Sequence, residues 1–547
     1  MYSTLSDFID ALDQAGELHR VAAKVSPILE ISQITDRISK SAAPTTSVTA
    51  AITDAHHAHL GGKALLFENV EGSDMPLAIN LFGSYRRMEM ALGCTEGGFE
   101  ALADQVAKMI KPEPPTGMIE KLKKLPELAK IASFAPKTVR SGICQQVVKT
   151  GGEIDLFCLP IIKCWPYDGD PRKVGYSVDP PTGGGDGRFI TFGGMHTIGP
   201  QDAGKQVGEP RTSRNIGMYR AQLIDRNHTA MHWHVHHDGA RHWRQWKEVG
   251  QPMPLAITLG GESVLPYAAT APLPPGISEL LMAGFLNGGG IELVPCKTID
   301  LHVPANTEIV IEGYVSTEAG HVSYDPQTDG DIGPGAVFEG PFGDHTGFYS
   351  MPDRYPIFEV TAITHRRDPI YPTTIVGPPP QEDYYIGKAT ERIFLPLLQT
   401  LIPDILDYHL PMFGAFHNCV FVKIKKEYPL QARRVMHAIW GGGQIAWTKM
   451  IVVVDDRVNV HDQDEVLFNL CANFDPGRDM EIVNGPLDIL DHAAPRLGAG
   501  HKIGFDATAK IVGEEVHGQP IRNWPLPQTM DEHIRALVDN RWQEYGF

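Results

Sequence analysis

RNIGMYRAQLIDRNHTAMHWHVHHDG, residues 214–239, is the stretch that decides the fold of this chain. Apolar residues alternate with small or polar ones on both sides of Arg220 and again around Trp233, which is typical of half-buried β-strands. The segment DRN at 225–227 lies between the two runs and predicts a turn. The stretch therefore predicts a β-hairpin that brings Asn215, Arg220 and several histidines together on neighbouring strands.

The histidines of this hairpin predict a binding site. His232, His234 and His236 lie two residues apart, so a strand would direct them to one face and His237 to the other. Neutral imidazoles are common metal ligands, and a neighbouring arginine suits an anion. The alternative is an ordinary polar face of a sheet whose groups satisfy one another. Glu279, which precedes an apolar helical run, could add a ligand, or it could only stabilise the start of that helix.

A second candidate site is the segment FEGPFGDHTGF, residues 338–348. Glu339 and Asp344 lie five residues apart across a Gly-Pro-Phe-Gly turn, which can bring two carboxylates to one place. If both are buried, one pKa rises and gives a general acid, while the other carboxylate stays ionised beside Arg220. His345 is an alternative acid or a contact for a phenolic oxygen. A solvated acidic turn without function is the other interpretation.

Composition excludes several classes of protein. The 547 residues contain 48 Lys+Arg against 66 Asp+Glu, a net charge of −18, which opposes binding to nucleic acid or to an anionic membrane. The seven cysteines form no CxxC pair, so neither a zinc knuckle nor a disulfide framework is indicated. The first residues lack a signal peptide pattern, and no stretch approaches the roughly 18 apolar residues of a membrane span. We expect a soluble, cytoplasmic protein.

Walker A, GxGxxG and GxSxG motifs are absent from the sequence, which removes the commonest nucleotide-binding, dinucleotide-binding and hydrolase interpretations.

The order of periodic segments predicts a mixed α/β (α+β) chain of several domains. Regularly spaced strand-like runs between 189 and 364 indicate a barrel or closed sheet, and helix and strand alternate again beyond 369. Residues 41–62 are expected to form a surface insertion, residues 118–134 a helix, and residues 318–335 an excursion between strands. The predicted domains are 1–135 (N-terminal α/β), 136–364 (β-barrel), 365–520 (C-terminal α/β) and 521–547 (linker and terminal helix).

Two further segments point to contacts between parts of the protein. The Pro-rich segment 378–390 leads to a helix start with Lys388, which could receive an anion, or the segment only joins two domains. The terminal segment places an apolar face on a helix that follows a Pro-rich linker, and such helices often dock on a neighbouring subunit. That face consists of Ile534, Leu537, Val538 and Trp542.

Several motifs together resemble the UbiD family of decarboxylases, which use prenylated FMN. They are NIGMYRAQL (215–223), the hairpin MHW…H…DG, PLPPGISE (272–279), EGPFGDHTG (339–347) and GKATERIFLPLL (387–398), and the resemblance extends over nearly the whole chain. It implies an α/β N-terminal domain, a central split β-barrel that binds the flavin, and a C-terminal α/β oligomerisation domain with a terminal amphipathic helix.

The resemblance also implies site residues. Asn215, His236 and Glu279 would bind a divalent ion, usually Mn2+, that holds the flavin phosphate, and K+ is a further candidate ion. Arg220, Glu339 and Asp344 would form the catalytic trio. The positions that would contact prenylated FMN are Asn215, Met218, Tyr219, Arg220, His232, Trp233, His234, His236, His237, Asp238 and Glu279.

The activity implied by the resemblance is a reversible, non-oxidative decarboxylation of an aromatic carboxylic acid, in which the flavin accepts electrons while CO2 leaves and Asp344 protonates the product. Aspartate followed by histidine is similar to members that act on hydroxybenzoates. An aryl-CoA thioester substrate, or carboxylation as the working direction, remains open. The implied partners are the aromatic acid, CO2, a flavin prenyltransferase and further copies of the chain, as a dimer or hexamer.

Two interpretations from other classes compete with this one. The HxH alternation also suits a cupin-like histidine-metal oxygenase, which would use iron and oxygen without a flavin. A flavin- or metal-binding scaffold protein without turnover is the other rival. Neither explains the distant EGPFGDHTG segment.

Overall fold

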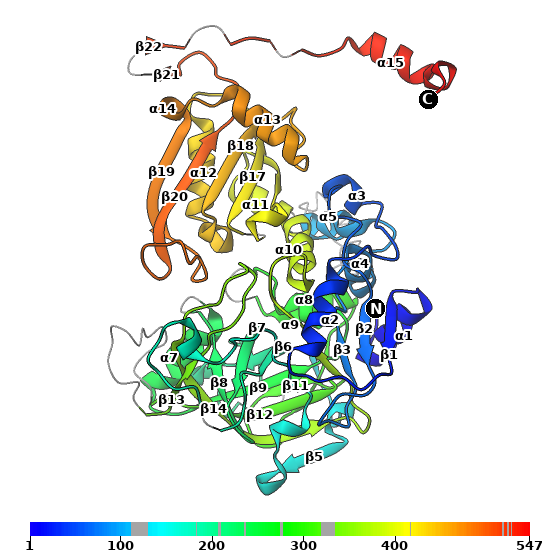
Figure 1. The fold of residues 1–547 in the computed structure, drawn as a ribbon, viewed down its shortest axis with the longest axis vertical. Coiled ribbons are helices and arrows are strands. Elements are labelled where there is room, and N and C mark those ends of the chain that lie inside the picture. The colour runs from blue at the N-terminus through cyan, green and yellow to red at the C-terminus, as the bar shows by residue number, and fades with distance from the viewer. Residues whose placement is uncertain are drawn as a thin grey trace, which may run out of the picture.

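The computed structural model shows three bodies along the chain: an N-terminal α/β layer, a central β-barrel and a C-terminal α/β sheet (Figure 1). The mixed α/β class expected from the sequence is confirmed. The structure describes residues 1–110, 129–181, 183–205, 209–234, 237–273, 277–318, 334–415, 417–516, 519–521, 524–526 and 528–547.

The N-terminal layer is a small sheet covered by helices. Helix α1 (Leu5–Gln14) begins at a capping box between Thr4 and Asp7 and buries its apolar face. The described strands of the sheet run in the order β1 (Leu18–Val21), β2 (Ala64–Phe67), β3 (Leu77–Ile79) and β15 (Tyr371–Thr373). The chain therefore returns to this sheet after leaving the barrel. The helices of the layer are α2 (Glu30–Ser39), α4 (Tyr85–Leu92) and α5 (Gly98–Ile110).

The segment 41–62 lies largely at the surface, as its composition predicted, but part of it is anchored in the interior. It contains the short helix α3 (Ala50–Thr53), after which Asp54 is buried. One oxygen of Asp54 accepts hydrogen bonds of 2.6 Å from the hydroxyls of Tyr85 and Tyr384, and the other lies 2.9 Å from His57 Nδ1. Because Tyr384 belongs to the C-terminal half, Asp54 links segments that are far apart in the sequence.

The central body is a closed barrel, as the regular strand spacing predicted. Within the described residues, six strands form a ring in the order β12, β9, β6, β7, β8, β14, and β14 pairs again with β12. Their bounds are β6 Phe189–Thr197, β7 Asn215–Leu223, β8 His228–His232, β9 Met253–Leu259, β12 Ile309–Val315 and β14 Asp353–His365. Strand β13 (Ala336–Glu339) adds to the edge of β14. Most of the excursion expected at 318–335 lies outside the described residues.

The C-terminal body is a twisted sheet with helices against it (Figure 1). In the described part of the chain its strands run in the order β16 (Ile405–His409), β17 (Cys419–Ile424), β18 (Met450–Asp455), β20 (Ala499–Asp506) and β19 (Met480–Pro486). Valines and isoleucines of β17 and β18 are buried on both faces, as expected for central strands. The helices are α10 (Glu382–Ile393), α11 (Leu395–Leu401), α12 (Gln431–Trp440) and α13 (Gln463–Asn473).

Smaller elements connect these bodies. They are β4 (Lys137–Thr138), β5 (Val147–Thr150), α7 (Asp238–Glu248), α8 (Leu265–Ala268), α9 (Glu279–Asn287), β10 (Glu292–Pro295), β11 (His302–Pro304), α14 (Pro476–Asp479), β21 (Glu515–Val516) and β22 (Gln519–Pro520). Most of the helix expected over 118–134 lies outside the described residues.

The terminal helix α15 (Glu532–Asn540) extends away from the C-terminal sheet (Figure 1). None of its residues is buried, and Ile534 and Leu537 are exposed together with Trp542 beyond it. Its apolar face thus faces solvent in the isolated chain. Among the helices of the described residues, none has both the length and the apolarity that crossing a membrane requires.

We predict that Asp54→Ala lowers the free energy of unfolding by about 1–3 kcal/mol, because it leaves two buried tyrosine hydroxyls without their acceptor. Urea unfolding followed by circular dichroism measures the change. The exposed Asp74, changed to alanine, is the matched control and should leave the transition within about 0.5 kcal/mol of the wild type. Equal unfolding free energies for both variants would contradict the linking role of Asp54.

Candidate active site

The predicted hairpin is formed by β7 and β8. Arg220 lies opposite His232, and Leu223 lies opposite Thr229. The turn is closed by Asp225, whose Oδ1 accepts hydrogen bonds from the backbone N–H groups of Asn227 (3.0 Å) and His228 (2.9 Å). The sequence pattern therefore located the strands and the turn correctly.

Arg220 is the centre of a buried ion cluster. Its Nε and Nη2 donate to the two oxygens of Glu339 at 2.7 and 3.2 Å, and its Nη1 donates to Asp344 Oδ2 at 2.8 Å. Nη2 also donates to Ser350 Oγ at 3.1 Å, and the guanidinium lies 4.6 Å from the ring centre of Phe342. The three charged side chains are all buried. The structure thus brings together the predicted trio, and the solvated-turn interpretation is wrong.

The electrostatics of this cluster differ from the expectation that one carboxyl pKa rises. Burial opposes ionisation of Glu339, but the charges of Arg220 and His232 outweigh it and lower its pKa to about 2. Burial likewise opposes ionisation of Asp344, yet His345 and Arg220 lower its pKa below the usual range. Burial would lower the pKa of Arg220, but Glu339 and Asp344 raise it. Because one guanidinium lies between both carboxylates, both stay ionised.

The backbone of the loop that carries Asp344 is bound by residues that the sequence analysis did not single out. Asp168 accepts from the backbone N–H groups of Gly343 and Trp165, both at 2.8 Å, and Gln222 Oε1 accepts from Gly340 N at 2.8 Å. Gly343 is required, since a Cβ there would lie 2.1 Å from Cδ1 of Trp165. The sequence signal for Trp165 and Asp168 is the stretch LPIIKCWP (159–166), which also resembles the family, and the acidic turn after it.

The histidines do not alternate along one strand. Strand β8 ends at His232, and the chain leaves the sheet before His234. His237 was expected on the opposite face, yet its ring stacks on His234 at 4.8 Å and on Tyr219 at 5.0 Å between centroids. His232 Nδ1 lies 3.0 Å from Glu339 Oε2, so this histidine joins the trio. His236 lies outside the described residues. The HxH alternation that favoured a cupin-like oxygenase is therefore absent from the part of β8 that is described.

The other predicted contact residues surround the hairpin. Met218 and Tyr219 are half-buried on β7, and Trp233 is fully buried just beyond β8. Asp238 is the first residue of α7 and pairs with Arg241 at 2.8 Å.

Glu279 contacts the residue next to Asn215 at the start of β7. Glu279 is the first residue of α9, and its Oε2 accepts from the backbone N–H of Ile216 at 2.9 Å. Burial raises the pKa of this carboxyl to about 7. Glu279 therefore does more than stabilise its own helix, because it faces the residue next to Asn215. A divalent cation would favour the ionised carboxylate at this position, so the donor set fits a metal.

Three of the predicted cofactor contacts carry buried polar atoms without a protein partner. Among the described residues, these include Asn215 Nδ2, His232 Nε2 and Trp233 Nε1. Buried polar groups are normally hydrogen-bonded, and each one left unpaired costs about 1–3 kcal/mol. Such atoms clustered on one hairpin fit the binding of a polar ligand there.

Lys388 does not form the anion site that its position after a Pro-rich loop allowed. It is buried in α10, where its Nζ lies 2.6 Å from Glu391 Oε2 and 2.9 Å from His409 Nδ1. Its charge is used inside the protein, which supports the alternative in which segment 378–390 joins two parts of the chain.

We predict that Glu339→Gln lowers the free energy of unfolding by about 3 kcal/mol at pH 7, because Arg220 then stays buried with one charged partner fewer. The exposed Glu359 on neighbouring β14, changed to glutamine, is the control and should have little effect.

The difference in unfolding free energy between the wild type and Glu339→Gln should depend on pH. Since the pKa of Glu339 is lowered from 4.5 to about 2 in the folded protein, its contribution is complete above pH 4.5 and is lost as the pH falls towards 2. The difference between wild type and Glu339→Gln should therefore narrow in acid. A difference that is absent at pH 7, or constant down to pH 3, would contradict the ion cluster.

Comparison with family models covers most of the chain in three consecutive segments. Residues 9–106 match the 3-octaprenyl-4-hydroxybenzoate carboxy-lyase N-terminal domain, and residues 137–379 match the Rift-related domain of the same enzyme family. Residues 384–507 match its C-terminal domain. The Rift-related segment contains the hairpin and the loop of Asp344.

Similar proteins align along the whole length. An uncharacterized protein of Aquifex aeolicus is 44% identical over 548 residues, covering 100% of this chain and 99% of its own. An uncharacterized protein of Archaeoglobus fulgidus is 42% identical over 545 residues, covering 99% of this chain and 98% of its own.

Solved structures share the fold. The closed form of vanillic acid decarboxylase from Sedimentibacter hydroxybenzoicus has a TM-score of 0.74 at 22% identity, with 100% of this chain and 98% of that chain covered. An evolved dimeric form of the UbiD-class enzyme HmfF from Pelotomaculum thermopropionicum, solved with prFMN, has a TM-score of 0.67 at 23% identity, with 93% and 96% covered. The apo 3,4-dihydroxybenzoic acid decarboxylase from Enterobacter cloacae has a TM-score of 0.67 at 19% identity, with 98% and 99% covered.

From the three matched domains and the relatives aligned over its full length, we conclude that this chain belongs to the UbiD family of decarboxylases and is a carboxy-lyase of that family.

Proposed function

We propose that this chain is a prenylated-FMN-dependent decarboxylase that reversibly and non-oxidatively removes CO2 from an aromatic carboxylic acid of the hydroxybenzoate type. The observation that carries the proposal is the buried cluster in which Arg220 joins Glu339 to Asp344, beside a hairpin with unpaired polar atoms. An ionised acid next to a guanidinium suits a site that receives a carboxylate substrate and later delivers a proton.

The cofactor proposal rests on the hairpin and on one relative. Asn215, His232 and Trp233 offer donors to a polar ligand, and the HmfF structure holds prFMN. We assign the cofactor contacts to Asn215, Met218, Tyr219, Arg220, His232, Trp233, His234, His236, His237, Asp238 and Glu279. Prenylated FMN, when bound, supplies the electron sink that loss of CO2 from an aromatic ring requires.

The metal proposal places a divalent ion, Mn2+ by family resemblance, on Asn215, His236 and Glu279. Glu279 supports it because its buried carboxyl lies beside β7 and has a raised pKa that a cation would lower. K+ remains a candidate for a further ion. A flavin prenyltransferase is the proposed supplier of the cofactor.

Arg220 would bind the substrate carboxylate, and Asp344 would transfer the proton. Asp344 is ionised in this structure because Arg220 and His345 both stabilise its negative charge. An arriving substrate carboxylate competes for Arg220 and adds a second negative charge, and both effects raise the pKa of Asp344. Asp344 can then take up a proton and give it to the ring carbon after CO2 leaves, which replaces one carbon–carbon bond by one carbon–hydrogen bond.

The substrate class is inferred from chemistry near Asp344. His345 follows it directly, and its pKa is raised because Asp344, Asp383 and Asp488 outweigh the effect of burial. An imidazole beside the acid suits a phenolic oxygen, and two proteins of the same fold are decarboxylases of vanillic acid and 3,4-dihydroxybenzoic acid. We also infer assembly into a homo-oligomer through α15, whose apolar side chains are exposed.

We predict that Asp344→Asn lowers the rate of hydrogen–deuterium exchange into the product ring by about 100-fold or more, since an amide cannot donate the proton. The assay uses holoprotein, hydroxybenzoates in D2O and detection by NMR. Flavin content should stay close to that of the wild type. The exposed Asp368, changed to asparagine, should retain normal exchange. Wild-type exchange in Asp344→Asn would remove Asp344 from the reaction, and no exchange by the wild type with any aromatic acid would contradict the substrate class.

A further inference from the structure

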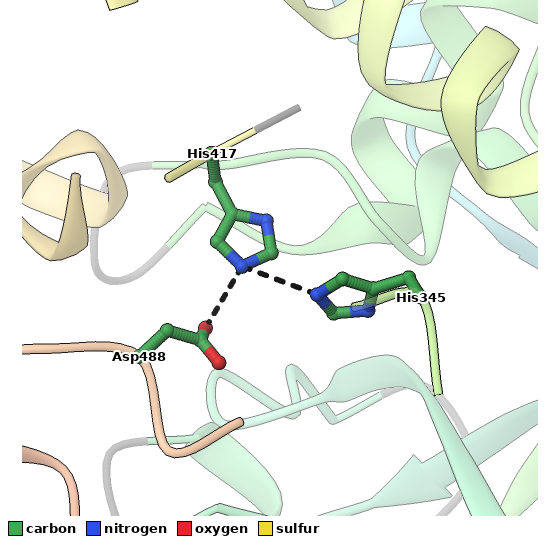
Figure 2. Close-up of side chains that lie close together, drawn as sticks. All are labelled: His345, His417 and Asp488. Atoms are coloured by element: carbon green, nitrogen blue, oxygen red, sulfur yellow. Dashed lines mark hydrogen bonds and ion pairs between the residues drawn. The ribbon is translucent and has the colours of Figure 1, made fainter. Parts of the chain in front are cut away.

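Three side chains from separate segments converge where the barrel meets the C-terminal sheet. His345 lies in the loop after β13, His417 precedes β17, and Asp488 follows β19. Figure 2 shows the two imidazoles and the carboxylate pointing toward one another. His345 thus belongs to the active-site loop, whereas the other two belong to the C-terminal body.

The spacing of their ligand atoms is that of a coordination sphere. His345 Nε2 lies 3.2 Å from His417 Nε2, and His417 Nε2 lies 3.2 Å from Asp488 Oδ2. The ligand atoms of all three residues lie within 4.8 Å of one another. Two atoms that are each about 2.1 Å from one zinc ion stand roughly 3.0–3.4 Å apart at the usual ligand angles. A rotation of the Asp488 carboxylate can complete such a sphere.

The active-site acid orients one of these ligands. Asp344 Oδ1 lies 2.9 Å from His345 Nδ1 and accepts the backbone N–H of the same residue at 2.8 Å. A carboxylate that accepts from Nδ1–H leaves the lone pair on Nε2, the atom directed at His417 and Asp488. Metal-binding histidines usually donate their other ring N–H to a carboxylate in this way.

The charges around the cluster also suit a cation. Asp344, Asp383 and Asp488 are the carboxylates that influence His345. The two Nε2 atoms face each other at 3.2 Å, a distance at which one neutral imidazole can donate to the other or both can bind one cation.

A second histidine cluster is paired with side-chain cations. Glu391, His409 and His461 also lie within ligand distance of one another. There, however, Lys388 Nζ lies 2.6 Å from Glu391 and 2.9 Å from His409, and Arg392 Nη1 lies 3.1 Å from His461. Side-chain cations occupy the place of a metal ion, so we assign no metal to that cluster.

We propose that His345, His417 and Asp488 bind one divalent transition-metal ion of the zinc type, which ties the C-terminal body to the loop that carries Asp344. Two imidazoles and one carboxylate form a donor set that favours transition metals over Mg2+ or Ca2+. Three protein ligands leave a coordination position for water. The site is separate from the ion assigned to Asn215, His236 and Glu279. It shares His345 with the proposed phenol contact, so metal binding is measured without substrate or turnover.

Cobalt binding to the full-length protein, without a histidine tag, tests this proposal. After removal of metals by a chelator, Co2+ is titrated, and bound Co2+ per chain is measured together with the visible absorption of the Co2+–imidazole complex. We expect the wild type to bind one Co2+ more than His417→Ala. We also expect Asp488→Asn, which preserves side-chain shape, to weaken this site by at least about 100-fold, since loss of an outer-shell partner alone costs 10–100-fold.

Two control variants separate this site from others. His437, which is 53% exposed on α12 of the same body, should give wild-type Co2+ binding when changed to alanine. Glu279→Ala should lose the other ion, and the flavin with it, yet retain the Co2+ that depends on His417. The proposal is overturned if wild type and His417→Ala bind the same number of Co2+ ions with equal affinity, or if the absorption disappears in Glu279→Ala and persists in Asp488→Asn.

Discussion

The buried guanidinium of Arg220 is the constraint on which the active site depends. A buried arginine is strongly unfavourable unless carboxylates pair with it, and here Glu339 at the end of β13 and Asp344 in the loop after it do so. Arg220 lies on β7 and Glu339 on β13, so the pair forms only if β8 and β14 lie between them in the closed barrel. The closed ring of strands therefore positions the ion cluster. Asp168 and Gln222 then fix the backbone of the loop, so that Asp344 is held rather than free to turn outward.

Much of this fold could be predicted from the sequence, because the barrel strands alternate clearly and the 225–227 turn has an acid at its first position. The family motifs predicted the Arg220–Glu339–Asp344 cluster. Local patterns alone predicted two separate candidate sites, the hairpin with Arg220 and the turn with Glu339 and Asp344. The end of β8 at His232 could not be predicted. The sequence pattern continues to alternate after His232, although the pairing of β8 with β7 and β14 has stopped. The pKa of the two acids was also misjudged, because like charges raise a pKa only where no guanidinium bridges them. Asp488 and Asp168 act through contacts far along the chain, which periodicity does not reveal.

Polar contacts join the three bodies in addition to apolar clusters that extend from the N-terminal layer into the barrel and onto α10. Asp54 accepts from Tyr85 and from Tyr384, which connects the N-terminal layer to α10. At the other side, His345 and His417 connect the loop of Asp344 to the C-terminal body. Polar contacts of this kind depend on protonation and on bound ions, so the position of the C-terminal body relative to the acid is sensitive to both. In the proposed enzyme, Asp344, which delivers the proton, and His345, which contacts the C-terminal body, are adjacent residues.

The central claim is that the hairpin at 214–239 binds prenylated FMN beside the Arg220 cluster. The most direct measurement is the absorbance spectrum and intact mass of the cofactor released from protein that was co-expressed with a flavin prenyltransferase. The account predicts a mass equal to that of prenylated FMN. Protein that contains no flavin under these conditions, and iron in its place, would contradict the account and would favour an oxygenase.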